Sequence, residues 1–322
     1  MGKLNNGIWN DTDNRITEKG VFIRDSDYFD KPVSPFHCRE ISAHPGRYFL
    51  IASESCPWSH RVIIARALGK LETVLPLVIA AGPRIEGYAL PTGHELPGKA
   101  SKFRHMHQLY TLSNRNFSGR TTVPVLWDSF SGTIVSNSSI EILRAFWTVA
   151  SNTEHMRPSH QIQQIDDCSD RIYIGLANAV YEAGLAQSQI AYNNAVGLVF
   201  DTLDELECTL INQPFLMGDS ITEADWLLFP VLVRFDAVYA TYFRCTRARL
   251  IDYPALWAYA RKLFQSAGIA QTVNFDAILE GYYSNDGDLN PYGIIAEKPH
   301  ADWHEPVVST CKSAQNYRHA FN

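Results

Sequence analysis

The chain of 322 residues lacks the patterns that define several common classes of protein. No uninterrupted apolar run approaches 18 residues, so the sequence predicts no membrane-spanning helix. The first residues contain no apolar core typical of a signal peptide, and we therefore expect a cytoplasmic protein. Basic residues are not in excess, since 28 Lys and Arg stand against 34 Asp and Glu. This balance disfavours nucleic acid and anionic membranes as partners.

Cofactor motifs are missing as well. No P-loop and no GxGxxG occurs where a strand turns into a helix, so we expect no nucleotide cofactor. There is no HExxH motif. His105 and His107 alternate along the chain without an obvious further ligand, and we expect ordinary surface imidazoles there rather than a metal site.

Paired cysteines are also absent, because none of the six forms a CxxC motif. Without a sign of secretion they are expected to be thiols rather than disulfides. Redox chemistry at any one of them would need a second thiol from elsewhere, and glutathione is the obvious candidate. The six are Cys38, Cys56, Cys168, Cys208, Cys245 and Cys311.

Cys56 stands out by its position. It follows an apolar segment, residues 48–52, that predicts a buried strand, and it precedes Pro57 and helical spacing of apolar residues. A cysteine at a helix N-terminus lies beside unpaired N–H groups and the positive end of the dipole, which favours the nucleophilic thiolate. The alternative is a buried structural cysteine. A dyad with His60 is not expected, because that ring would point away around the helix.

The first half of the chain has the order of a thioredoxin-like domain. We expect an extended N-terminal arm over residues 1–45 and the domain itself over 46–148. Within the domain the order is strand, helix, strand, a long irregular insertion over residues 80–119, two strands and a helix capped by Ser138 or Ser139. The bond between Val123 and Pro124 is predicted to be cis, with an ordinary trans edge proline as the alternative.

The second half reads as helical throughout. A linker over residues 149–160 leads to helical periodicity over 161–283, followed by a tail rich in turn formers over 284–322. The strongest helix start is at Thr222, with a carboxylate three residues on at Asp225. We interpret this pair as a stabilising capping box rather than a site of chemistry.

Several motifs together resemble the glutathionyl-hydroquinone reductases, the Xi class of glutathione transferases. The resemblance covers nearly the whole chain and implies a thioredoxin-like domain followed by an all-helical domain. It also implies glutathione as cosubstrate, a small aromatic substrate and a homodimer. The motifs are GVFIR at 20–24, CPWSHR at 56–61, TVPVLWD at 122–128, TIVSN at 133–137, RFDAVY at 234–239, DYPALW at 252–257 and TVNFD at 272–276.

The resemblance also implies roles for individual residues. Cys56 matches the nucleophile that attacks the sulfur of a glutathionyl adduct. The glutathione-binding positions correspond to Tyr88, Arg120, Thr121, Thr122, Val123, Pro124, Ser138 and Ser139. Three tyrosines match those that line the aromatic site and stabilise the thiolate or move a proton: Tyr181, Tyr239 and Tyr282.

The chain departs from the family pattern at two of these positions. Tyr88 stands where the family usually has Trp, and Ser138 stands where it usually has Glu. These departures leave two alternatives open. One is a transferase or lyase that adds glutathione to another electrophile or removes it. The other is a ligand-binding protein without catalysis, which predicts that Cys56 reacts like an ordinary thiol.

Overall fold

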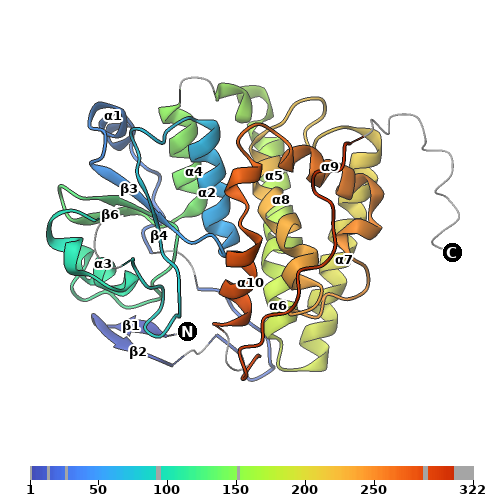
Figure 1. Cartoon of the computed structure of the whole chain (residues 1–322), viewed down its shortest axis with the longest axis horizontal. Helices are drawn as coiled ribbons and strands as arrows, with labels where there is room; N and C mark the ends of the chain where they lie inside the picture. Colours follow the sequence, from blue (N-terminus) through green and yellow to red (C-terminus); the bar gives the residue numbers. More distant parts are fainter. Residues whose placement is uncertain are drawn as a thin grey trace, which may run out of the picture. The chain divides into compact units, whose positions relative to one another are not determined.

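The computed structural model describes residues 2–12, 15–25, 28–91, 96–150, 153–285 and 289–307. Its contacts divide the chain into two compact units (Figure 1). The first unit comprises Met1–Glu154 and Gln271–Lys298, and the second comprises His155–Ala270 and Pro299–Asn322. Cys311 lies outside the described residues. Within the described ranges, no helix is long and apolar enough to cross a membrane.

A four-stranded sheet forms the centre of the first unit, in the order β4-β3-β5-β6. β3 runs parallel to β4 and antiparallel to β5, and β5 is antiparallel to β6. Every residue of β3 is buried, which explains its unbroken apolar sequence. The predicted strands are present. The strands are β3 (Tyr48–Ala52), β4 (Leu77–Ile79), β5 (Val125–Asp128) and β6 (Thr133–Ser136).

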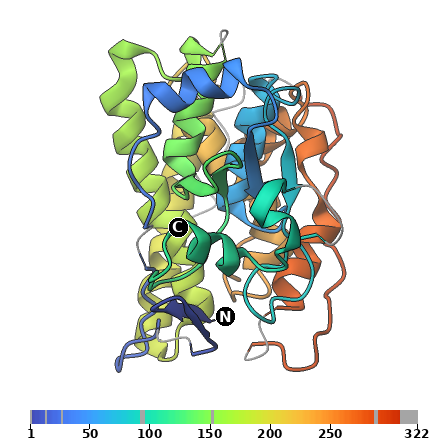
Figure 2. The same ribbon diagram turned by 90° about the vertical axis from the view of Figure 1, so that its left-hand side faces the viewer.

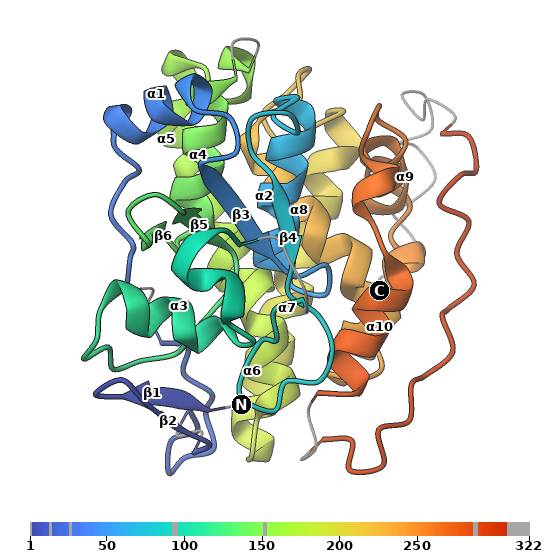
Figure 3. The same ribbon diagram turned by 60° about the vertical axis from the view of Figure 1, so that its left-hand side comes forward.

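Helices cover both faces of this sheet. α2 and α4 pack against each other on one face, and α3 lies on the other (Figure 3). α3 and a short 3-10 helix over Gly98–Lys102 lie within the insertion that we expected to be irregular. Its buried Met106, Leu109 and Tyr110 have helical spacing, but Gly and Pro residues before them obscured this short stripe. The helices are α1 (Pro35–Ala43), α2 (Pro57–Leu68), α3 (Met106–Ser113) and α4 (Ser139–Val149).

The N-terminal segment is more regular than the extended arm that we predicted. It contains α1 and a hairpin of β1 (Lys3–Asn5) and β2 (Ile8–Asn10), visible in Figure 2. The hairpin turns through Asn6 and Gly7, both with positive φ, which is the strongest short hairpin signal in the sequence. Leu4 exchanges two backbone hydrogen bonds with Gly119, at 2.8 and 2.9 Å, and its side chain joins the core of the unit.

α10 (Phe275–Tyr283) and its flanking residues belong to the first unit, whereas the sequence placed residues 271–283 in the helical domain. Hydrogen bonds between distant residues explain the grouping. The His60 ring lies 3.0 Å from the Thr272 hydroxyl, and Asn274 donates to Glu54 at 3.0 Å. The α10 backbone also approaches the loop before α2 closely, because a Cβ atom added to Gly281 would lie 2.2 Å from that of Ser55.

The second unit is helical, as predicted. Asp225 caps α8 from the third helical position: its carboxylate accepts the Thr222 N–H at 2.8 Å, the Leu216 N–H at 3.0 Å and the Tyr259 hydroxyl at 2.8 Å. The predicted capping box is therefore confirmed.

The α-helices are α5 (Ile162–Ile172), α6 (Ala179–Leu185), α7 (Gln189–Asn212), α8 (Glu223–Arg234) and α9 (Pro254–Phe264). Two π-helical segments, Tyr173–Asn178 and Phe235–Tyr239, join them, with 3-10 turns at Glu154–Met156, Ser159–Gln161 and Leu250–Asp252. A further 3-10 turn, Ala270–Thr272, leads to α10.

Candidate active site

Cys56 lies where the sequence predicted it, between β3 and the first turn of α2. It is the N-cap residue, with extended backbone angles of −83° and 122°, and Pro57 follows at the first helical position. Among the described residues, no side chain caps this helix start. The Cys56 side chain is mostly buried, and its Sγ lies 3.6 Å from the Val123 carbonyl oxygen. The thiol therefore lies beside the backbone N–H groups of the first turn of α2, which no described side chain caps.

The segment facing the thiol contains the predicted cis bond between Val123 and Pro124. A buried hydrogen-bond network holds Thr122, the residue before Val123, in place. The Tyr110 hydroxyl donates to the Thr122 carbonyl at 3.0 Å, and the Asn137 amide donates to the Thr122 hydroxyl and to the Tyr110 oxygen, both at 3.1 Å. We assigned no role to Tyr110 or Asn137 from the sequence, because neither carries a local signal. Asn137 lies in the TIVSN motif, which was the only available indication.

The Tyr88 phenol lies close to the Cys56 thiol. The phenol interacts electrostatically with this thiol, and the Arg84 guanidinium lies 4.4 Å from the centre of the Tyr88 ring. Burial raises the pKa of the Tyr88 phenol to about 12, while Arg84 and Arg120 act in the opposite direction. The phenol is therefore neutral at physiological pH and can donate a hydrogen bond to a thiolate. From the sequence we expected this residue only to contact glutathione, and its link to Cys56 emerges from the fold.

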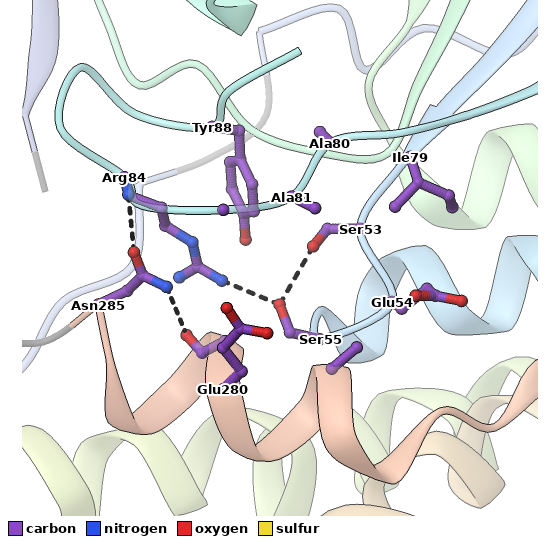
Figure 4. A pocket seen from close by; sticks show the side chains of 13 residues that line it. Ser53, Glu54, Ser55, Ile79, Ala80, Ala81, Arg84, Tyr88, Glu280 and Asn285 are labelled. Atoms are coloured by element: carbon purple, nitrogen blue, oxygen red, sulfur yellow. Dashed lines mark hydrogen bonds between the residues drawn. The ribbon is translucent and has the colours of Figure 1, made fainter. Parts of the chain in front are cut away.

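A pocket opens beside this group, between the loop before Cys56, the segment containing Tyr88 and α10 (Figure 4). Arg84 crosses it, donating from its side chain to the Ser55 hydroxyl at 3.0 Å and from its backbone to Asn285 at 2.7 Å. The Ser53 and Ser55 hydroxyls lie 3.1 Å apart on one wall, and Glu280 of α10 faces them. The lining combines these polar and charged groups with apolar residues such as Ile79, Ala80 and Ala81, so it offers hydrogen-bond partners to a ligand beside an apolar wall.

The other predicted glutathione-binding residues lie on the same unit. Ser138 is the N-cap residue of α4, and none of the described side chains caps this helix. Its backbone N–H donates to the Ser136 hydroxyl at 3.2 Å. Ser139, the first residue of α4, is also buried. The buried hydroxyl of Thr121 has no hydrogen-bond partner among the described residues, so a polar ligand group there would satisfy it.

The other described cysteines differ from Cys56 in their surroundings. Burial raises the pKa of the Cys168 thiol to about 11 and that of Cys245 to about 12, and it also raises that of Cys38. These three therefore remain protonated at neutral pH. His60 is buried, and its ring lies 3.0 Å from the Thr272 hydroxyl.

The three tyrosines of the expected aromatic site are divided between the units. Tyr181 of α6 and Tyr239 of the Phe235–Tyr239 segment pack together in the second unit, with ring centres 6.1 Å apart, and both contact Phe243. Each adjoins a π-helical segment, a feature frequent at functional sites. Tyr282 lies on α10 in the first unit, next to Gly281. Their convergence on Cys56 stays a prediction.

Comparison with known proteins places the chain in a family. Residues 55–148 match the family Glutathione S-transferase, N-terminal domain, and residues 189–262 match Glutathione S-transferase, C-terminal domain. The chain is 39% identical over 326 residues to the glutathionyl-hydroquinone reductase YqjG of Escherichia coli K12, an alignment covering 95% of this chain and 98% of that protein. The chain belongs to the glutathionyl-hydroquinone reductases. The resemblance recognised in the sequence motifs is thereby confirmed.

Further relatives agree with this assignment. The glutathionyl-hydroquinone reductase PcpF of Sphingobium chlorophenolicum is 37% identical over 308 residues, covering 93% of this chain and 96% of that protein. A Xi-class glutathione transferase from Natrialba magadii superposes with a TM-score of 0.82 at 35% identity, covering 96% of each chain. The glutathione-bound structure of YqjG superposes with a TM-score of 0.78 at 36% identity, covering 95% of this chain and 98% of that chain. The predicted fold, a thioredoxin-like domain followed by an all-helical domain, is confirmed.

Proposed function

We propose that this enzyme reduces glutathionyl hydroquinones, using glutathione as the reductant and Cys56 as the nucleophile. Membership of the family supports the reaction class. The observation that supports the nucleophile is the position of Cys56 at the uncapped start of α2, with the neutral Tyr88 phenol close to its thiol. Helix N–H groups and the phenol O–H would both stabilise a thiolate.

The proposed reaction has two thiol-exchange steps. In the first, the Cys56 thiolate attacks the sulfur of the adduct, an S–S bond forms and the C–S bond to the ring breaks. The ring carbon takes the electron pair and a proton, so the aromatic is reduced and leaves as a hydroquinone. In the second, a glutathione thiolate attacks the mixed disulfide, which releases glutathione disulfide and restores the Cys56 thiolate.

Glutathione is proposed to bind along the segment that faces the thiol. The main chain of Val123 would pair with the tripeptide in the manner of an added strand, supported by its carbonyl oxygen lying next to the Cys56 thiol. The γ-glutamyl carboxylate would lie at the start of α4, where the helix dipole favours an anion. The remaining members of this subsite are Tyr88, Arg120, Thr121, Thr122, Pro124, Ser138 and Ser139.

The tyrosines are proposed to serve the aromatic part of the substrate. Tyr181, Tyr239 and Tyr282 would supply hydroxyl groups that orient the ring and deliver the proton to the departing carbon. Changing each of them to Phe removes only the hydroxyl. Such changes should therefore lower turnover more than they weaken binding of the aromatic, as steady-state kinetics can measure.

Mass spectrometry of the intact protein tests this proposal. Mixed with a glutathionyl hydroquinone in the absence of free glutathione, the wild type should gain the mass of one glutathionyl group at Cys56 and release the free hydroquinone. The Cys56→Ser variant should do neither. If that variant still turns over, with a stable glutathione conjugate formed or consumed, the transferase or lyase alternative replaces the reductase. If the wild type neither reacts nor turns over but binds the aromatic, the protein is a ligand-binding member of the family.

The proposed steps require no nucleotide and no metal, since both electrons come from thiols. The expected homodimer and the cytoplasmic location stay predictions, as does the absence of nucleic-acid and membrane partners. Light scattering on the purified chain measures the first of these directly.

A further inference from the structure

Glu86, His105 and His107 come together on the first unit, although nothing in the sequence links the glutamate to the histidines. One potential ligand atom from each lies within 4.8 Å of those of the other two. The His107 Nε2 atom is 3.0 Å from a Glu86 carboxylate oxygen, and the two imidazole rings stack with their centres 5.5 Å apart. From the sequence we expected ordinary surface imidazoles, because a third ligand was missing. The fold supplies that third ligand.

We propose that Glu86, His105 and His107 bind a divalent transition-metal ion of the zinc type. Two imidazoles and a carboxylate are a ligand set that zinc accepts, and three protein ligands leave a fourth position for water or another group. Magnesium and calcium are less suited to this set, since they prefer oxygen ligands.

The surroundings prepare the histidines for this role. His107 is the better buried, with 14% of its side chain exposed, while Glu86 is 48% exposed and keeps the site open to solvent. A buried ring nitrogen of His105, Nδ1, has no hydrogen-bond partner among the described residues.

Neighbouring residues hold the site in shape. The Trp9 ring of β2 stacks on the His107 ring at 5.2 Å, which limits its rotation. His105 is the N-cap residue of α3, and its backbone N–H donates to the Gln108 side chain at 3.0 Å. The N-terminal end of α3 has a partial positive charge that opposes a cation, and the Glu86 carboxylate offsets it.

A metal ion here would join two segments that already pair. Met106 donates its backbone N–H to the Tyr88 carbonyl at 2.9 Å, and Leu90 donates to the Arg104 carbonyl at 2.7 Å. Metal binding would add a link between Glu86 and the start of α3. The segment that carries Tyr88, whose phenol lies close to Cys56, would therefore become more rigid.

Calorimetric titration of the full chain with Zn²⁺ tests the proposal. The titration uses a Cys56→Ser background, because a reactive thiol would bind zinc by itself. We expect one saturable site, with affinity at least roughly tenfold lower in His105→Ala and in His107→Ala and reduced in Glu86→Gln. The matched control is His44→Ala, which removes an exposed imidazole 3.5 Å from the Glu40 carboxylate and should leave the affinity unchanged.

A second measurement guards against misfolded variants. Circular dichroism without metal checks that each variant is folded, and Zn²⁺ should raise the melting temperature of the background protein but not that of His107→Ala. The proposal is overturned if no saturable site is found. It is equally overturned if folded His105→Ala and His107→Ala variants bind Zn²⁺ as tightly as the background protein does.

Discussion

The helices α2 and α4, whose N-cap residues are Cys56 and Ser138, differ in their capping from α8, whose N-cap residue is Thr222. At the start of α8, the Asp225 carboxylate accepts two backbone N–H groups and two hydroxyl groups, so its lone pairs are used within the protein. At the starts of α2 and α4, no described side chain caps the helix. All three starts are buried, so the difference does not come from exposure to water.

The capped start of α8 contributes to stability, whereas the uncapped starts of α2 and α4 are available to bind anions. Buried N–H groups that lack a capping side chain cost stability unless something else satisfies them. In a glutathione transferase, a thiolate and the carboxylate of the tripeptide are anions of the kind that helix N-termini bind. The starts of α2 and α4 therefore leave open the N–H groups whose counterparts in α8 are bound by Asp225. Four changes test this contrast, in order of decreasing effect.

The largest effect is expected for Cys56→Ser. Serine is a preferred N-cap residue, so the change should leave the free energy of unfolding within about 1 kcal/mol of wild type. Reductase activity should fall at least about a thousandfold, because a hydroxyl cannot replace the thiolate nucleophile. Kinetics and urea denaturation measure the two quantities. The control is Cys208→Ala, which removes an exposed thiol and should change neither. Full activity in Cys56→Ser would show that chemistry does not depend on this helix start.

The second effect is expected for Asp225→Asn. The change places an NH₂ group against donors that now share a carboxylate, and burial prevents water from replacing the lost bonds. The free energy of unfolding should fall by about 2–4 kcal/mol. Asp252→Asn is the matched control, because Asp252 also caps its own helix start through Arg249 but is exposed. That change should cost no more than about 1 kcal/mol. Equal losses would mean that burial of the cap is irrelevant.

A third change probes how α10 is held against the loop that precedes α2. In Gly281→Ala, the added methyl group would meet the Ser55 Cβ at 2.2 Å, so the helix or the loop must shift. We expect a loss of about 1–3 kcal/mol in stability, together with reduced turnover because Tyr282 and Cys56 both flank this contact. Adding Ser55→Gly should restore part of the loss.

The control for this third change is Gly197→Ala in α7. An added Cβ there meets nothing within 4 Å. Alanine should therefore stabilise the helix by about 0.5–1 kcal/mol. A Gly281→Ala variant that also gains stability would show that the close approach of α10 does not constrain the loop.

The smallest effect is expected for Ser138→Glu. A carboxylate at the start of α4 should form a charge-assisted hydrogen bond with the ammonium group of glutathione and tighten binding by about 1 kcal/mol. Ser138→Gln has nearly the same size without the charge and should bind glutathione less tightly than Ser138→Glu. Titration calorimetry gives both affinities. Unchanged or weaker binding in Ser138→Glu would mean that the tripeptide lies elsewhere or that another acidic group already fills this role.

Several features of the fold could be predicted because their signals lie within a few residues of each other. The apolar run at 48–52 followed by Cys56 and Pro57 predicted β3 and the start of α2, and Thr222 with Asp225 predicted the cap of α8. Helix α3 and the N-terminal hairpin were not predicted. The apolar stripe of α3 is short and is stabilised by packing in the core of the unit, whereas the Asn6-Gly7 turn of the hairpin is a local signal that we overlooked.

The sequence by itself determined the family, the place of Cys56 at a helix start and the order of the four strands of the central sheet, since each signal lies in neighbouring residues. Only the tertiary structure decided which distant groups meet. It placed the Tyr88 phenol close to Cys56, Asn137 against Thr122, α10 beside Ser55 and Glu86 beside His107. These contacts arise from packing between separate segments of the chain, which in the case of Glu54 and Asn274 are 220 positions apart. Periodicity and capping preferences extend over only a few residues, so no local pattern encodes such pairs.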